Sequence, residues 1–224
     1  MSATSLTAVA PSPRRGFTLL ELLVSMGIIS LLAVMLIPVV PMARRHARDA
    51  KCKSNLTQIW KTMNIYANNH DDILFSNLED PLLISNVAYR DGQPTGLGCM
   101  YPLYLREPDI LYCPADQVRD PKWERGWANW GTPTGIVELS YGYRGGHGIQ
   151  DDPNKPIRLA LIDAHPKKVF VIDYYEPFQD PPRVHHPRHI NMMRGWGKVD
   201  QMNVEPSFGP NVEDLDAALA LVDQ

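Results

Sequence analysis

The feature of this 224-residue chain that most constrains its fold is an apolar stretch near the N-terminus. Residues 22–43 contain no charged side chain, and a helix of about 20 apolar residues can cross a hydrocarbon core about 30 Å thick. The apolar region of a secretory signal is only about 7–15 residues long and is followed by a cleavage site of small residues. The stretch therefore predicts a membrane-spanning helix over about residues 17–43.

One acidic side chain, Glu21, lies at the start of this stretch. A carboxylate inside a bilayer is costly and usually has a charged partner. Cleavage between Gly16 and Phe17 would supply one, because the new α-amino group would lie four residues before Glu21. The position of Glu21 is therefore consistent with a chain that is cut after Gly16.

The residues around this position resemble a known processing signal. Residues 14–21 read RRGFTLLE, which is similar to the class III signal of type IV pilins and type II secretion pseudopilins. The resemblance implies that prepilin peptidase removes residues 1–16 on the cytoplasmic side and that Phe17 is N-methylated. It also implies that Glu21 neutralises the Phe17 amine of a neighbouring subunit in a filament. Pro38 lies where members of that family often carry a helix-loosening proline.

The helix is expected to continue beyond the membrane as an amphipathic segment over residues 44–72. Neither Gly nor Pro occurs between Met42 and Asp72. Large side chains recur there at the three- and four-residue spacing of one helical face: Cys52, Leu56, Ile59, Met63 and Tyr66, flanked by Trp60 and Ala67. This pattern predicts one helix of some fifty residues, over residues 17–72.

A basic cluster follows the apolar stretch: Arg44, Arg45, Arg48, Lys51 and Lys53. Positive charge usually marks the cytoplasmic end of a membrane helix, which opposes the orientation that the processing signal requires. We keep the leader on the cytoplasmic side and expect these side chains to contact anionic lipid head groups.

Residues 73–224 are expected to form a loop-rich globular β-domain, because most of the 20 prolines and 15 glycines follow residue 80. The β-branched run over residues 168–175 predicts a strand at the centre of the sheet. The expected fold class is α+β and pilin-like, in which a long N-terminal helix continues into a domain packed on a small antiparallel sheet. Residues 212–222 predict a short docking helix or a frayed end of the chain.

Short motifs in the rest of the chain resemble prepilin-type proteins of planctomycetes and verrucomicrobia. They are CKSNLTQI (52–59), YANNHDD (66–72), LYCPAD (111–116) and SYGY (140–143). An H-X9-DG-like region follows at residues 186–197, with His186, Asn191 and Gly197 in the expected places. Trp196 replaces the aspartate, so the resemblance implies the hairpin and its glycine but no role for that carboxylate.

Three groups of side chains raise the question of a metal ion. Cys52, Cys99 and Cys113 would lie in an oxidising compartment and allow one disulfide among three pairings. They show no Cys-x-x-Cys spacing, which argues against a thiolate metal site. His185, His186 and His189 suggest zinc, but Pro187 interrupts any helix that would align them. The acidic run over residues 68–72 is interpreted as a helix end rather than a calcium site. We expect no metal and no other cofactor.

Trp123, Trp127 and Trp130 lie among turn residues. Aromatic side chains so close together either cover a loop-rich core or form an exposed binding surface. The core interpretation is favoured.

A structural role is favoured over an enzymatic one. The chain contains no phosphate-binding Gly-x-x-x-x-Gly-Lys-Ser/Thr loop, no Gly-x-Ser-x-Gly and no His-Glu-x-x-His. Its net charge of −3 gives no sign of a nucleic-acid surface. The resemblance implies a single-pass inner-membrane protein with a periplasmic or extracellular domain. Its partners would be prepilin peptidase, other pilin or pseudopilin subunits, an assembly platform with its ATPase, and the bilayer.

Two alternatives remain open. One is a membrane-anchored periplasmic metal-binding protein or enzyme that uses His185, His186 and His189. The other is an uncut single-pass module of the receptor kind. Within the favoured class, the sequence leaves open a pilus, a type II secretion pseudopilus or a DNA-uptake filament.

Overall fold

The computed structural model describes residues 16–77, 85–116, 127–145, 155–173, 175–176, 183–184, 186 and 189–203. The chain divides into two compact units, Met1–Arg44 and Arg45–Gln224. Each unit is described by itself.

The first unit contains helix α1 (Leu19–Leu36) and the first residues of helix α2 (Val39–Asn68). α1 is long and apolar enough to cross a membrane, and none of its side chains is buried. A helix that is apolar on every side needs lipid or other helices around it. The hydroxyls of Ser25 and Ser30 donate to the carbonyls of Leu22 and Met26, so these polar groups are satisfied within the helix.

The expected uninterrupted helix is divided in two by a turn at Ile37 and Pro38. The amide of Ile37 still donates to the carbonyl of Ala33, over 3.1 Å. Pro38 has no N–H to continue the series, and its ring crowds the carbonyl four residues earlier. The expectation of one unbroken helix over residues 17–72 was therefore wrong. The helix is interrupted at Pro38, which was expected only to loosen it.

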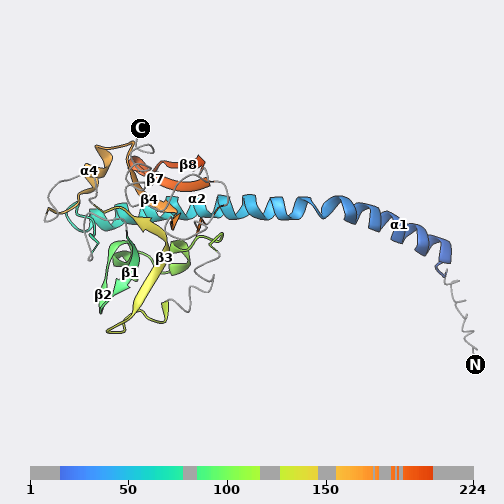
Figure 1. The fold of residues 1–224 in the computed structure, drawn as a ribbon, viewed down its shortest axis with the longest axis horizontal. Helices are drawn as coiled ribbons and strands as arrows, with labels where there is room; N and C mark the ends of the chain where they lie inside the picture. Colours follow the sequence, from blue (N-terminus) through green and yellow to red (C-terminus); the bar gives the residue numbers. More distant parts are fainter. Residues whose placement is uncertain are drawn as a thin grey trace, which may run out of the picture. The chain divides into compact units, whose positions relative to one another are not determined.

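The second unit is built on a six-stranded sheet in which every pairing is antiparallel, in the order β2-β1-β3-β4-β7-β8 (Figure 1). The strands are β1 (Ser85–Arg90), β2 (Gln93–Pro94), β3 (Ile136–Tyr143), β4 (Val169–Asp173), β7 (His189–Arg194) and β8 (Val199–Asn203). The expected central strand is confirmed, because β4 lies inside the sheet and all five of its residues are buried. The α+β fold class is confirmed as well.

Short elements complete this unit. They are the 3-10 helices η1 (Gly96–Met100), η2 (Pro108–Leu111) and η3 (Gly195–Gly197), helix α4 (Leu159–Asp163), and a separate pair of strands, β5 (Tyr175–Glu176) and β6 (Arg183–Val184). The acidic run is a helix end: Asp71 and Asp72 have positive φ angles, and the Asp72 carboxylate accepts a hydrogen bond from the amide of Ala160 at the start of α4. The predicted tail helix over residues 212–222 lies outside the described residues.

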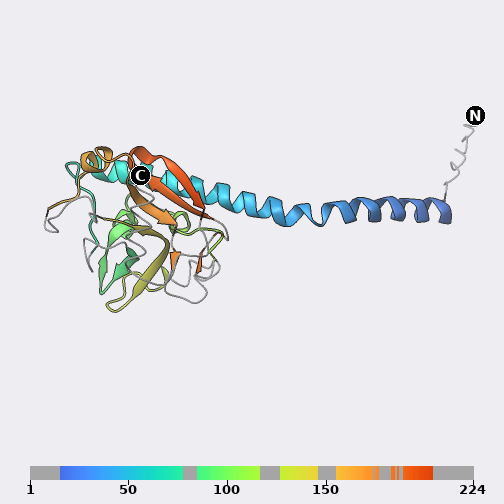
Figure 2. The same ribbon diagram turned by 45° about the horizontal axis from the view of Figure 1, so that its top comes forward.

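One face of α2 is buried against the sheet domain. Figure 2 shows the part of α2 after Arg45 running beside the sheet. Its fully buried apolar residues belong to the same core cluster as strands β3 and β4: Cys52, Leu56, Ile59, Met63 and Ala67. Trp60 and Tyr66 pack against that core while partly exposed. The predicted amphipathic face is thus confirmed.

Of the three tryptophans in the turn-rich region, Trp127 belongs to this core and Trp130 packs against it. Trp127 stacks on Trp130 with ring centroids 5.0 Å apart and an interplanar angle of 8°, and only 9% of Trp127 is exposed. The core interpretation is confirmed for these two residues, and Trp123 lies outside the described residues.

A hairpin was expected at residues 186–197. The structure has a hairpin of β7 and β8, which pair in register from His189 with Asn203 to Met193 with Val199, so its second strand lies beyond the expected region. Gly197 has a φ of +70°, and a Cβ there would come within 2.1 Å of the Trp60 ring. Any other residue at Gly197 would force the indole of α2 to move. The side chain of Trp196, in contrast, is 68% exposed.

The burial of α2 can be tested with two isoleucines of the same helix. Ile59→Ala removes a fully buried side chain, so the free energy of unfolding should fall by about 2–5 kcal/mol. Ile65→Ala is the matched control, because Ile65 is 52% exposed, and its effect should be about 1 kcal/mol or less. Urea denaturation followed by tryptophan fluorescence measures both. Equal losses in the two variants would contradict the packing of this face.

Candidate functional site

The N-terminal processing signal contains a capped helix start. The amide of Glu21 donates to the Thr18 hydroxyl oxygen over 3.2 Å, and the Glu21 carboxylate accepts from the Thr18 amide over 2.9 Å. These reciprocal bonds form a capping box. In the uncut chain, therefore, Glu21 has a local partner, the backbone at the first turn of α1.

Gly16 and Phe17 precede this cap. Both residues are exposed, Phe17 by 82%, and neither belongs to a helix. A peptidase needs a peptide bond that is free of regular secondary structure. The bond between Gly16 and Phe17 meets that requirement.

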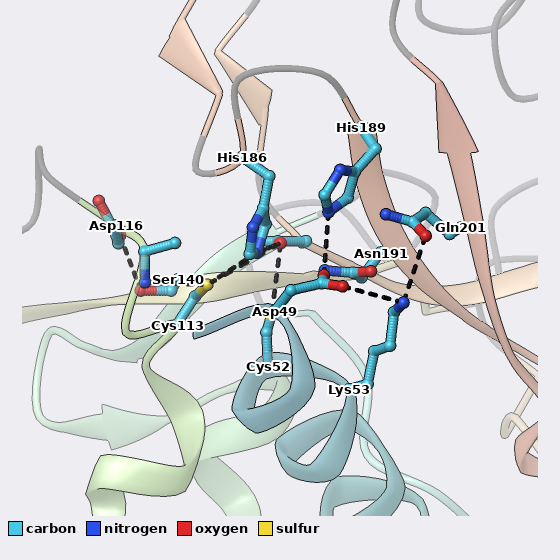
Figure 3. A network of polar contacts seen from close by, with 12 residues as sticks. Asp49, Cys52, Lys53, Cys113, Asp116, Ser140, His186, His189, Asn191 and Gln201 are labelled. Atoms are coloured by element: carbon cyan, nitrogen blue, oxygen red, sulfur yellow. Dashed lines mark hydrogen bonds and ion pairs between the residues drawn. The ribbon is translucent and has the colours of Figure 1, made fainter. Parts of the chain in front are cut away.

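A second candidate group of side chains lies inside the globular domain (Figure 3). Four separate segments contribute one residue each. Cys52 comes from α2, Cys113 follows η2, Asp173 ends β4, and His186 forms an isolated bridge with His189 ahead of β7. All four residues are buried, with exposed fractions of 4% or less. We call these four residues the Cys-Asp-His cluster.

The polar atoms of the Cys-Asp-His cluster converge on one point. His186 Nε2 lies 3.1 Å from Asp173 Oδ2 and 3.4 Å from Cys113 Sγ. The Cys52 thiol donates to Asp173 Oδ2 over 3.3 Å, and Cys113 Sγ lies 3.9 Å from the same oxygen. One ligand atom from each residue lies within 4.8 Å of all the others.

Both sulfur atoms also accept hydrogen bonds from outside the cluster. The Tyr141 hydroxyl donates to Cys52 Sγ over 3.2 Å, and the amide of Ala115 donates to Cys113 Sγ over 3.4 Å. Donors aimed at sulfur favour the thiolate over the thiol. The surroundings therefore support negative charge on both cysteines once a cation compensates it.

Without such a cation, Cys52 and His186 keep their protons at neutral pH. The hydrogen bond to Cys113, burial and the nearby Asp173 charge raise the pKa of the Cys52 thiol far above its usual value. Burial lowers the pKa of His186, but hydrogen bonds to Asp173 and Cys52 outweigh it and raise that pKa to about 9. At neutral pH in the absence of metal, the Cys52 thiol is therefore neutral and His186 is protonated beside Asp173.

A polar network adjoins the cluster on α2 and β7. The Asp49 carboxylate accepts from His189 Nε2 over 2.9 Å and from Asn191 Nδ2 over 3.0 Å, and Lys53 Nζ lies 3.0 Å from its second oxygen. The His189 ring stacks on His186 with centroids 4.7 Å apart. These contacts connect α2 to β7, and the stacked His189 ring covers one face of the His186 ring.

The predicted site residues are distributed as follows. His186 and His189 lie together but have different partners. His186 contacts Cys113 and Asp173, whereas His189 contacts Asp49. His185 lies outside the described residues. Cys52, Cys99 and Cys113 are all free thiols, so the structure contains no disulfide among them. Cys99 is partly buried elsewhere in the core.

The Cys-Asp-His cluster was missed because its members come singly from distant segments. Cys113 is separated from Asp173 by 60 residues, and Cys52 from Asp173 by 121. Metal motifs are usually recognised by close pairs of ligands along the chain. The available signals were Asp173, an acidic residue at the end of a fully apolar strand, and two cysteines that each lie in a family-like motif.

Comparison with known proteins identifies the N-terminal signal. The family model of the prokaryotic N-terminal methylation motif matches residues 11–37. No curated protein and no solved structure matches the chain. The motif indicates a type IV pilin-like or pseudopilin-type protein. Together with the one helix of membrane-spanning length found among the described residues, it indicates a membrane-anchored protein.

The Asp49 network predicts a pH-dependent contribution to stability. Burial raises the pKa of Asp49, but hydrogen bonds from Lys53, His189 and Asn191 together lower it by a larger amount. The pKa therefore lies below its usual value. A carboxylate whose pKa is lowered by folding stabilises the protein above its unfolded pKa of about 4 and loses that effect as the pH falls through the lowered value.

Asp49→Asn should therefore lower the free energy of unfolding at pH 7 by about 1 kcal/mol or less, because solvent screens the partly exposed pair. The difference from the unsubstituted protein should shrink as the pH falls below the unfolded pKa of about 4 and through the lowered pKa of the folded state. Urea denaturation at several pH values measures it. Asp91→Asn, in an exposed turn, is the control and should have little effect. A difference that persists unchanged in acid would contradict the assigned charge interaction.

Proposed function

We propose that this chain is a pilin-like or pseudopilin-like structural subunit that is cut by prepilin peptidase and assembled through its N-terminal helix. The observation that carries the proposal is the methylation motif over residues 11–37, together with an apolar helix that buries none of its surface. In this proposal residues 1–16 are the cleaved leader and residues 17–72 the assembly helix. Residues 73–224 form the domain carried on the filament surface.

The geometry of the signal supports cleavage after Gly16. The bond to Phe17 is exposed and precedes the capped start of α1. Cleavage creates an α-amino group on Phe17, which the same pathway would methylate. The products would be a leader peptide and a mature chain that carries a positive charge at the edge of its apolar helix.

Glu21 is the proposed partner of that charge in a neighbouring subunit. In the structure its carboxylate binds only local groups of Thr18 among the described residues. The apolar surface of α1 has no other charged side chain to pair with an amine. One carboxylate and one amine per subunit would fix the axial register of adjacent helices, and apolar packing would supply the cohesion.

We further propose that the machine is a type II secretion pseudopilus or a type IV pilus-like filament in the inner membrane, with the domain in the periplasm or outside the cell. The basic residues after the apolar stretch would then lie against anionic lipid before assembly. An assembly platform and its ATPase would drive polymerisation, since the chain has no phosphate-binding loop of its own.

The first test is the N-terminal mass of the protein from native membranes. We expect a mature chain that begins with N-methylated Phe17. Gly16→Ala should block cutting, and a Cβ at Gly16 meets no atom within 4 Å, so a block would reflect recognition rather than misfolding. Gly27→Ala is the matched control, because it is equally free of contacts, and it should be processed normally. An intact Met1 terminus in the unsubstituted protein would overturn the proposal.

The role of Glu21 can be separated from its capping contact. Glutamine also fits the third position of a capping box, so Glu21→Gln keeps the helix start and removes only the charge. Processing should continue, while the yield of sheared filaments or of subunit cross-links should fall by about tenfold or more. Thr18→Ala removes the cap and keeps the charge, and it should assemble. Normal assembly of Glu21→Gln would exclude the proposed pairing.

A further inference from the structure

The Cys-Asp-His cluster has a chemistry that the filament role does not use. It combines two sulfur donors, one imidazole nitrogen and one carboxylate oxygen, and all four residues are buried. We propose that Cys52, Cys113, Asp173 and His186 bind one Zn²⁺ ion in a closed structural site.

The donor set matches zinc better than other metals. Zn²⁺ accepts thiolate, imidazole and carboxylate ligands in tetrahedral sites. Mg²⁺ and Ca²⁺ prefer six or more oxygen ligands, which this cluster does not provide. A carboxylate among the ligands disfavours Cu(I), which selects soft sulfur donors.

The distances between the donor atoms fit a tetrahedron around one ion. With bonds of about 2.3 Å to sulfur and about 2.1 Å to nitrogen or oxygen, ligand atoms in a tetrahedral site lie roughly 3.4–3.8 Å apart. Four of the six separations are 3.1, 3.3, 3.4 and 3.9 Å, and all six are within 4.8 Å. For these four pairs, the side chains need to move by only a few tenths of an ångström to receive the ion.

A divalent cation would also compensate the negative charge of the ligands in their metal-binding forms. Two cysteines and one aspartate converge in a place from which water is excluded, so their negative forms need compensation. Zinc binds cysteine as thiolate and histidine as neutral imidazole, so its binding would release protons from the cluster and leave four bonds to the metal. The hydrogen bonds from Tyr141 and the Ala115 amide would remain on the two thiolates and orient them.

The site is structural rather than catalytic. A catalytic zinc keeps a coordination position open for water or substrate, whereas here four protein ligands complete the shell and each is buried. The ion would join α2, the turn after η2, the end of β4 and the segment before β7. It would thus link four segments, of which only β4 and β7 are paired with each other in the sheet.

The neighbouring group of Asp49, His186 and His189 does not form a second metal site by this argument. Asp49 already pairs with Lys53 and accepts from His189 and Asn191. Because the ammonium group of Lys53 compensates the carboxylate, this group is complete without a metal ion. Its His189 ring instead stacks on His186 from outside the cluster and helps to fix the position of that ring.

The metal content of the full-length chain, purified in detergent under reducing conditions, tests the proposal. After exposure to Zn²⁺ and removal of loosely bound metal, we expect about one zinc per chain. Cys52→Ser and Cys113→Ser should retain less than about a tenth of that amount, because each loses a thiolate ligand. Cys99→Ser, which changes the one cysteine outside the cluster, is the matched control and should retain the full amount.

A second measurement does not depend on whether the variants fold. Co²⁺ added to the unsubstituted metal-free protein should give thiolate-to-cobalt charge-transfer absorption and the intense visible bands of tetrahedral coordination, and Zn²⁺ should abolish both. Failure to bind either ion, or the weak bands of six-coordinate cobalt, would overturn the proposal. A disulfide between Cys52 and Cys113 in protein alkylated directly from native membranes would also overturn it. None of these results bears on N-terminal processing, so the proposed function is tested separately.

Discussion

The burial of one face of α2 is the interaction on which the globular domain depends. Five apolar residues of this face are completely buried and share a single core with the sheet. The same face carries Cys52 into that core and places Asn55 where its amide donates to the carbonyl of Tyr112 over 3.0 Å. Because the helix supplies both apolar packing and polar contacts, it fixes where the loops after η2 and the end of β4 must lie.

The helix face and the central strand could be predicted from the sequence because each depends on a pattern of neighbouring residues. The spacing of Leu56, Ile59 and Met63 describes a helical face, and the β-branched run of β4 describes a buried strand. The position of the helix break also had a local signal, Pro38, but the strength of its effect depends on what surrounds the helix, and the sequence alone did not settle it. Cleavage and pairing at Phe17 and Glu21 stay predictions, since they concern other molecules.

The Cys-Asp-His cluster could not be predicted in the same way. Its four side chains meet only after β3, β4 and the hairpin have been arranged around α2, and no spacing along the chain reports that arrangement. The absence of Cys-x-x-Cys was therefore weak evidence against a thiolate site. Asp173 was the informative residue: a carboxylate that ends an apolar central strand must find partners inside the core, because its burial is otherwise too costly.

The cost of burying charged groups also decides between a metal site and a disulfide. The proposed location of the domain is oxidising, which favours disulfides, and the sulfurs of Cys52 and Cys113 lie within 4.8 Å of each other. A disulfide, however, would engage only these two residues and would leave Asp173 and His186 as a buried ion pair, which is a weak source of stability. A Zn²⁺ ion engages all four groups and uses the donors already directed at both sulfurs. The arrangement of the whole cluster, rather than of the cysteines alone, therefore favours the metal.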